Sequence, residues 1–134
     1  MYKFFLILIC ISHAITVSAE DGYRLWLRYD RVKNGALVAQ YRNAISGVFA
    51  PDTSLIFASA RQELLTGLSG LLDVKYTLAT RPGNGTVVVA TKSRLPQDIP
   101  ATAAEYERLG DEGYAIVSIS NRDKKITLIT ANTD

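Results

Sequence analysis

The sequence has very little of the two side chains that many enzymes use for nucleophilic and metal chemistry. Its one cysteine is Cys10 and its one histidine is His13, and both lie in an apolar N-terminal segment that follows Lys3. A mature chain without this segment has neither residue. It then has no Ser/His/Asp or Cys/His nucleophile, no thiolate and none of the usual zinc ligand sets. A disulfide is excluded as well.

The apolar segment itself is typical of a signal peptide. It ends in Val17-Ser18-Ala19, whose small residues suit signal peptidase, so we expect cleavage of residues 1–19 and export to the periplasm or the medium. A membrane anchor needs about 20 apolar residues, whereas Ser12 and His13 interrupt this run. A lipoprotein signal prefers a small residue before its cysteine, and Cys10 follows Ile9.

Charge of either sign is not in large excess. Fifteen Lys and Arg residues face 13 Asp and Glu residues, for a net charge of +2. No basic face or acidic tail points to nucleic acid or to an anionic membrane. The predicted mature chain, residues 20–134, is long enough for one domain with its own core.

Residues 20–32 have the two-residue alternation of a β-strand. One side of this strand would carry Tyr23, Leu25, Leu27 and Tyr29, and the other Arg24, Trp26, Arg28 and Asp30. The Trp26 side is either a sugar-stacking surface or a packed polar face. Residues 33–50, with a turn signal at Asn34-Gly35, are expected to be loop or short irregular structure.

The middle of the chain predicts a helix followed by a hairpin. Asp52 or Thr53 can cap a helix that runs to about Leu72, because apolar residues recur at helical spacing: Ile56, Ala60, Leu64, Leu68, and Leu71 or Leu72. Strands at 74–79 and 86–91 flank the turn-forming sequence RPGNG, residues 81–85, which favours a hairpin. These glycines lack the lysine and the strand-loop-helix context of a phosphate loop. Asn84-Gly85-Thr86 matches the glycosylation sequon.

The C-terminal third predicts a weak helix at 101–109 and then a second hairpin, with strands at 113–120 and 125–131. The predicted fold class is therefore α+β. We expect a two-layer sandwich in which one mixed, mainly antiparallel sheet has helices packed on one face.

With His and Cys absent, only carboxylates remain as acid or base candidates. A glycosidase needs two carboxyl groups on opposite sides of the scissile bond, about 5–5.5 Å apart for retention and about 6.5–9.5 Å apart for inversion. Adjacent Asp111 and Glu112 do not provide this arrangement and suit a turn, and Asp21 lies at the mature N-terminus. We predict no catalytic residue, no cofactor-binding residue and no metal ligand in this chain.

Three stretches together resemble a known family. EDGYRLWLRYDRV at residues 20–32, LGDEGYAIVSIS at 109–120 and KKITLITANTD at 124–134 are similar, in order and spacing, to the amino-terminal domain of bacterial α-glucuronidases of glycoside hydrolase family 67. The resemblance covers nearly all of the mature chain, and residues 33–49 match it less clearly.

The resemblance implies an accessory role. In that family this α+β domain precedes a large (β/α)8 barrel, which removes glucuronic acid or its 4-O-methyl ether from xylan-derived oligosaccharides with inversion. The acid and base carboxylates lie in the barrel, and no residue here corresponds to them. The expected partners are that barrel and, through it, glucurono-oligosaccharides. The chain alone is expected to be inactive.

The last residues fit the same interpretation. Asn132, Thr133 and Asp134 are helix-capping residues that follow a predicted strand, so we expect them to begin a connection to a further helix and to the barrel. One alternative is a free-standing secreted module that binds glycan through the Trp26 side or the side with Tyr23 and Tyr29. The third hypothesis is a small enzyme that uses only carboxylates.

Overall fold

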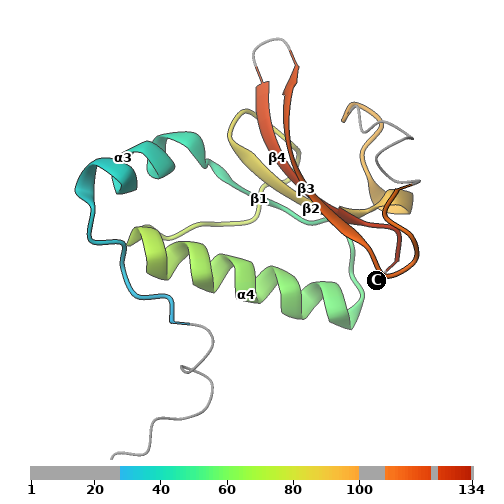
Figure 1. The fold of residues 1–134 in the computed structure, drawn as a ribbon, viewed down its shortest axis with the longest axis horizontal. Helices are drawn as coiled ribbons and strands as arrows, with labels where there is room; N and C mark the ends of the chain where they lie inside the picture. The colour runs from blue at the N-terminus through green and yellow to red at the C-terminus, as the bar shows by residue number, and fades with distance from the viewer. Residues whose placement is uncertain (1–27, 100–107, 122–123, 134) are drawn as a thin grey trace, which may run out of the picture.

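A computed structural model describes residues 28–99, 108–121 and 124–133. In this part of the chain the helices and strands are interleaved, and two consecutive strands come last (Figure 1). Their order is α3 (Gly35–Ala44), β1 (Gly47–Phe49), α4 (Leu55–Leu72), β2 (Thr86–Thr91), the 3-10 helix η2 (Lys92–Arg94), β3 (Tyr114–Asn121) and β4 (Lys124–Ala131).

The four strands form one mixed sheet in the order β1-β2-β4-β3. β1 pairs with β2 and β2 pairs with β4 in parallel, and β3 and β4 form an antiparallel hairpin. Parallel neighbours need a crossover, and α4 lies in the connection between β1 and β2. The predicted α+β class with one mixed sheet is confirmed, although the sheet contains more parallel pairing than the sequence led us to expect.

The long helix α4 lies along one face of the sheet (Figure 1). Its N-cap is Ser54, whose hydroxyl accepts a hydrogen bond from the Phe57 amide at 3.3 Å, while Asp52 accepts one from the Ser54 amide at 2.9 Å. The predicted helix is thus confirmed with its start shifted by a few residues. Phe57 and Leu72 are buried, but Ile56, which we predicted on the apolar stripe, is 62% exposed.

The opposite face of the sheet holds the main hydrophobic cluster. Successive strand residues point to opposite faces, and the alternate residues that cluster here are Val88 and Ala90 of β2, Ile119 of β3, and Ile126 and Leu128 of β4, with Ile99 packed against them. The segment after η2, which contains Leu95 and Ile99, therefore covers this face. Different parts of the chain therefore cover the two faces: α4 lies on one, and the segment after η2 lies on the other (Figure 1).

The region expected to be loop contains a helix and a strand. α3 begins at Gly35 because the Asn34 side chain accepts a hydrogen bond from the Leu37 amide at 3.1 Å, so Asn34-Gly35 starts a helix instead of forming a turn. Only Val38 of α3 is buried, which explains why no apolar stripe marked this helix in the sequence. β1 has only three residues.

The first predicted hairpin is wrong. Residues 74–79 do not pair with β2; Leu78 instead forms an isolated parallel bridge with Val48 of β1. The turn at residues 81–85 leads into β2 by way of Gly85, which has a φ of 76°. The second predicted hairpin is confirmed, with Ser118 opposite Thr127 and Ile116 opposite Ile129.

Two other predictions lie wholly or partly outside the described residues. The strand predicted at 20–32 falls on described residues only from 28 onward, and residues 28–32 are not in a strand. The helix predicted at 101–109 falls almost entirely on residues 100–107, which are not described.

Candidate interaction surface

The sheet face that carries α4 is covered only in part. On this face Val48 of β1 and Val87 and Thr91 of β2 are buried. Farther across the sheet Ile129 of β4 is half-buried, and its neighbour on β3, Ile116, is 65% exposed. Burial therefore falls from β1 to β3, and α4 shields one half of the face while the β4–β3 half remains open.

We call this uncovered half the open face. It is formed by alternate residues of the β3–β4 hairpin, namely Tyr114, Ile116, Ser118 and Ser120 of β3 and Lys125, Thr127, Ile129 and Ala131 of β4. Its side chains change in character along the strands. Aromatic and aliphatic groups lie at one end, and hydroxyl groups and an ammonium group lie at the other.

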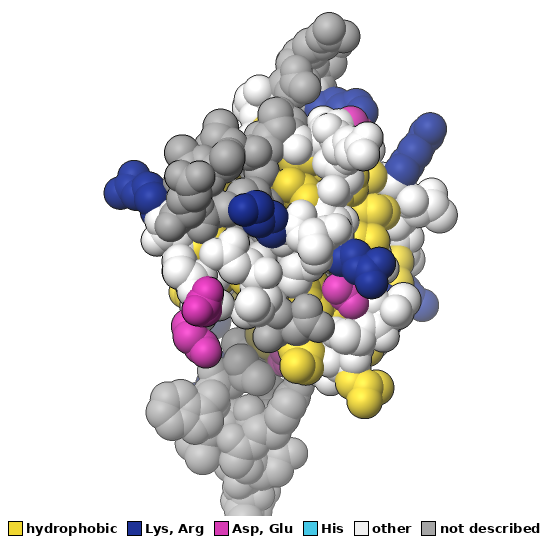
Figure 2. Space-filling model, turned by 90° about the vertical axis from the view of Figure 1, so that its right-hand side faces the viewer, with side chains coloured by type: hydrophobic (Ala, Val, Ile, Leu, Met, Phe, Trp, Pro, Cys, Tyr) yellow, Lys and Arg dark blue, Asp and Glu magenta, His cyan; other side chains and the backbone are white. Residues whose placement is uncertain are grey.

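The apolar end of the open face contains a shallow groove of about 210 Å³ between the hairpin and the start of α4. Ile56 and Phe57 of α4 form one wall, and Tyr114 and Ile129 of the hairpin form the other. Tyr114 is 71% exposed and the adjacent Leu55 is 87% exposed. Figure 2 views the molecule from the side on which α4 begins and shows hydrophobic side chains at the surface between charged ones. Exposed apolar surface of this kind is typical of interaction sites.

The polar end of the open face contains a second hollow, of about 550 Å³. Gln40 and Asn43 of α3 lie on one side of it, and Ser118, Ser120 and Lys125 lie on the other. Asn84 shapes its edge, because the Asn84 Oδ1 atom accepts a hydrogen bond from the Lys125 amide at 2.8 Å. This end offers hydrogen-bonding groups in place of apolar surface.

The end of β4 is held against the start of β3. The Asn132 Nδ2 atom donates to the carbonyl of Gly110 at 2.7 Å, and the Thr133 hydroxyl donates to the carbonyl of Asp111 at 3.0 Å. Ala131 and Thr133 also line the apolar groove. The residues that we predicted as helix caps therefore fix the direction in which the chain leaves the sheet, directly at the open face.

The carboxylates expected to be turn residues are where the sequence placed them. Asp111 and Glu112 are exposed, in the loop that leads into β3. Among the other described carboxylates, Asp52 supports the start of α4 and Glu63 accepts a hydrogen bond from the Tyr29 hydroxyl at 2.5 Å. These contacts are structural. The described residues contain no group of three or more His, Cys, Asp or Glu side chains arranged to hold a metal ion.

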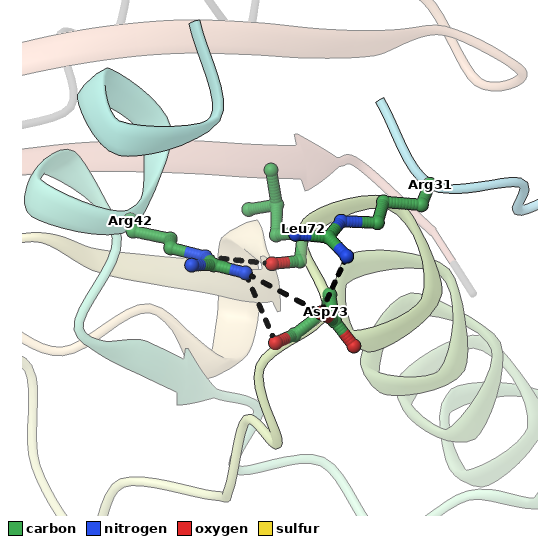
Figure 3. A network of polar contacts seen from close by, with 4 residues as sticks. All are labelled: Arg31, Arg42, Leu72 and Asp73. Carbon is green, nitrogen blue, oxygen red and sulfur yellow. Dashed lines mark hydrogen bonds and ion pairs between the residues drawn. The ribbon is translucent and has the colours of Figure 1, made fainter. Parts of the chain in front are cut away.

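Asp73 is the centre of a polar network at the end of α4 (Figure 3). The Arg42 Nε atom of α3 donates to the carbonyl of Leu72 at 2.7 Å, and its Nη2 atom donates to the carbonyl of Asp73 at 3.1 Å. The Asp73 carboxylate lies 3.2 Å from Arg31 and 3.8 Å from Arg42. These contacts satisfy carbonyls that the helix end leaves without partners and tie α3 and residue 31 to α4.

Tyr76 lies close to this network and is buried. Burial raises the pKa of its hydroxyl, and the positive charge of Arg42 opposes that rise. A neutral phenol at this position suits a packing role and gives no acid or base near neutral pH.

Residues 28–32 pack along the side of α4 instead of forming the predicted strand. The Val32 amide donates to the carbonyl of Leu71 at 2.9 Å, and Tyr29 lies against Gly67 and Gly70. The two glycines allow this approach, because a Cβ at Gly70 would lie 2.7 Å from the Tyr29 carbonyl oxygen. The two-residue alternation around Tyr29 does not indicate a contact with a helix.

The described residues form an α+β fold with one half of a sheet face left open. Residues 25–134 match the family model described as the N-terminus of glycosyl hydrolase family 67. Because this match covers most of the chain, the chain belongs to that family, as the sequence resemblance indicated. A search of curated proteins finds no match. In the described part of the chain, neither helix has the length and hydropathy of a membrane span.

Proposed function

We propose that this chain is the non-catalytic amino-terminal domain of an exported α-glucuronidase. Hydrolysis then belongs to a (β/α)8 barrel in the remainder of the same polypeptide, which removes glucuronic acid side chains from xylan-derived oligosaccharides. The observation that carries this proposal is the family match over residues 25–134. The domain would support the barrel and shape the approach to its active site.

The contacts of three described carboxylates support a non-catalytic role. Asp52, Glu63 and Asp73 each accept hydrogen bonds or form ion pairs that stabilise the start, the side or the end of α4. An acid and base pair for glycoside hydrolysis needs two carboxyl groups that face a bound sugar from opposite sides. These three carboxylates instead face the protein's own backbone and side chains.

The test compares two chains made from the same gene. The first is residues 20–134, and the second continues into the coding sequence that follows residue 134. We expect release of glucuronic acid from aldouronic oligosaccharides by the longer chain and none by the shorter one. Turnover by the shorter chain that survives stringent purification would refute the non-catalytic role. An inactive longer chain, or a stop codon after residue 134 in independent clones, would refute the proposal as a whole.

A further inference from the structure

We propose that a hollow between residues 31–33 and α3 binds the carboxylate of an acidic sugar, such as glucuronic acid on a xylan-derived oligosaccharide. We call it the basic hollow. The inference rests on the proposed function, because that function supplies an acidic oligosaccharide as the substrate. It goes further by assigning a place on this domain where that oligosaccharide is held.

The basic hollow has the size of a small-ligand site. Its volume is about 630 Å³, within the range of about 300–1,000 Å³ that is usual for ligand pockets. One wall is formed by residues 31–33 and the other by one side of α3, from Gly35 to Asn43. A Cβ at Gly35 would meet nothing within 4 Å, so the start of α3 leaves this space open.

The charge around the hollow is of one sign. Arg31, Lys33 and Arg42 line it, and none of the other described lining residues is Asp or Glu. In the whole sequence 15 basic residues face 13 acidic ones, so three cations around one hollow are a local excess. Arginine binds carboxylates through paired N–H donors, and lysine adds a positive point charge. The hollow therefore favours an anionic ligand.

Asp73 neutralises this charge only in part. Its Oδ2 atom lies 3.2 Å from Arg31 and 3.8 Å from Arg42 (Figure 3). A guanidinium group carries five N–H donors, so one ion pair leaves Arg31 with donors for a second carboxylate. Lys33 is exposed and has no ion-pair partner among the residues that the structure describes. Its charge is available to a ligand.

The remaining lining favours a sugar acid over an inorganic anion. Val32, Val38 and Ala39 supply apolar surface, and Asn43 supplies a side-chain amide. From residue 35 to residue 43 the α3 wall is about 12 Å long, which exceeds the size of a phosphate ion. The C–H groups of a sugar ring can pack on the apolar part, and its hydroxyl groups can bond to the amide. A phosphate ion would leave both unused.

A titration followed by nuclear magnetic resonance tests this inference on the chain of residues 20–134. The probe is xylotriose that carries one glucuronic acid side chain, and unsubstituted xylotriose and inorganic phosphate are compared with it. Lys33→Gln removes one charge from the hollow. Lys124→Gln is the matched control, because Lys124 is exposed on β4 and does not line the hollow. Circular dichroism checks that each variant is folded.

We expect the acidic oligosaccharide to shift the amide signals of residues 31–43, with an affinity in the millimolar range that falls as salt is added. Lys33→Gln should raise the dissociation constant by about fivefold or more, since a charged hydrogen-bond donor is lost. Lys124→Gln should leave it within about twofold, as expected for a distant exposed charge. If Lys33→Gln does not fold, Arg31→Gln removes a charge from the same wall and should have the same effect.

Three results would overturn the inference. The first is no shift of these signals at tens of millimolar ligand, and the second is an equal response to unsubstituted xylotriose, which has no carboxylate. The third is equal binding of phosphate at the same residues, which would mean an adventitious ion only. Release of glucuronic acid by the longer chain is assayed separately. Binding at the hollow with an inactive longer chain refutes only the proposed function, whereas an active longer chain without such binding refutes only this inference.

Discussion

At the scale of single residues, the contact between Tyr29 and α4 depends on the absence of side chains on the helix. Gly67 and Gly70 each lie where an added Cβ would come within 3 Å of Tyr29 atoms. The atom nearest a Cβ at Gly70 is the Tyr29 backbone oxygen, which cannot move without moving residues 28–32. Alanine is otherwise the better helix former by roughly 1 kcal/mol.

We therefore predict that Gly70→Ala lowers the free energy of unfolding by about 1 kcal/mol or more, since the clash outweighs the gain in helix propensity. Gly35→Ala is the matched control, because a Cβ at Gly35 meets nothing within 4 Å, and it should be neutral or slightly stabilising. Urea unfolding followed by circular dichroism measures both. Equal stability of the two variants would show that residues 28–32 do not pack on α4 in solution.

At the scale of elements, α3 is attached to the rest of the domain through one buried residue and one arginine. Val38 is its one buried residue, and Arg42 donates hydrogen bonds to the end of α4 (Figure 3). Arg31 also contacts Asp73, but both partners in that pair are more than half exposed. Both arginines contact the Asp73 carboxylate, and Arg42 also donates hydrogen bonds to the carbonyls of Leu72 and Asp73.

We predict that Arg42→Met lowers the free energy of unfolding by about 1–2 kcal/mol, because the carbonyls of Leu72 and Asp73 lose a charged donor. Arg31→Met should change it by less than about 0.5 kcal/mol, as expected for an exposed ion pair. Thermal unfolding of the two variants gives the comparison. If Arg31→Met lowers the free energy of unfolding as much as Arg42→Met does, the ion pairs of Asp73, and not the backbone hydrogen bonds of Arg42, hold α3 and residue 31 against α4.

The elements that could be predicted from the sequence are those with a long pattern of their own. α4 shows helical spacing over many residues, and the β3–β4 hairpin shows two strands joined by a local turn. α3 has a single buried side chain, so its pattern is weak. Leu78 pairs with β1 in parallel, and a parallel partner is determined by the crossover through α4 and not by any turn next to it.

The open face could not be predicted from the sequence for a related reason. Ile116 and Val117 are neighbours of similar hydrophobicity on β3, yet Ile116 is 65% exposed and Val117 packs against the core cluster. Strand alternation predicts that the two side chains point in opposite directions. Which side is covered depends on where α4 and the segment after η2 lie, and this is a property of the assembled sheet.

At the scale of the whole molecule, an open apolar face beside an edge strand affects solubility. β3 is at one edge of the sheet, and Tyr114 and Ile116 point away from the main core. Sheet edges with exposed apolar residues are sites of association unless they are covered. The chain of residues 20–134 is therefore expected to associate as its concentration rises.

We predict that Ile116→Lys makes this chain more nearly monomeric, because the new charge resists burial against another copy. The matched control is Ser118→Lys, on the same strand and the same face but at the polar end, which should leave the association almost unchanged. Size-exclusion chromatography with light scattering over a range of concentrations measures the mass of each. Identical behaviour of the two variants would place the association elsewhere on the molecule.

The two hydrogen bonds of Asn132 and Thr133 also have a mechanical consequence. They join the residues after β4 to the loop that enters β3, at Gly110 and Asp111, so the end of β4 is tied to the sheet at two points. A polypeptide that continues from this point would therefore start from residues that are hydrogen-bonded to the sheet's own loop. Loss of either hydrogen bond would release this point, and the orientation of a following segment relative to the sheet would then vary.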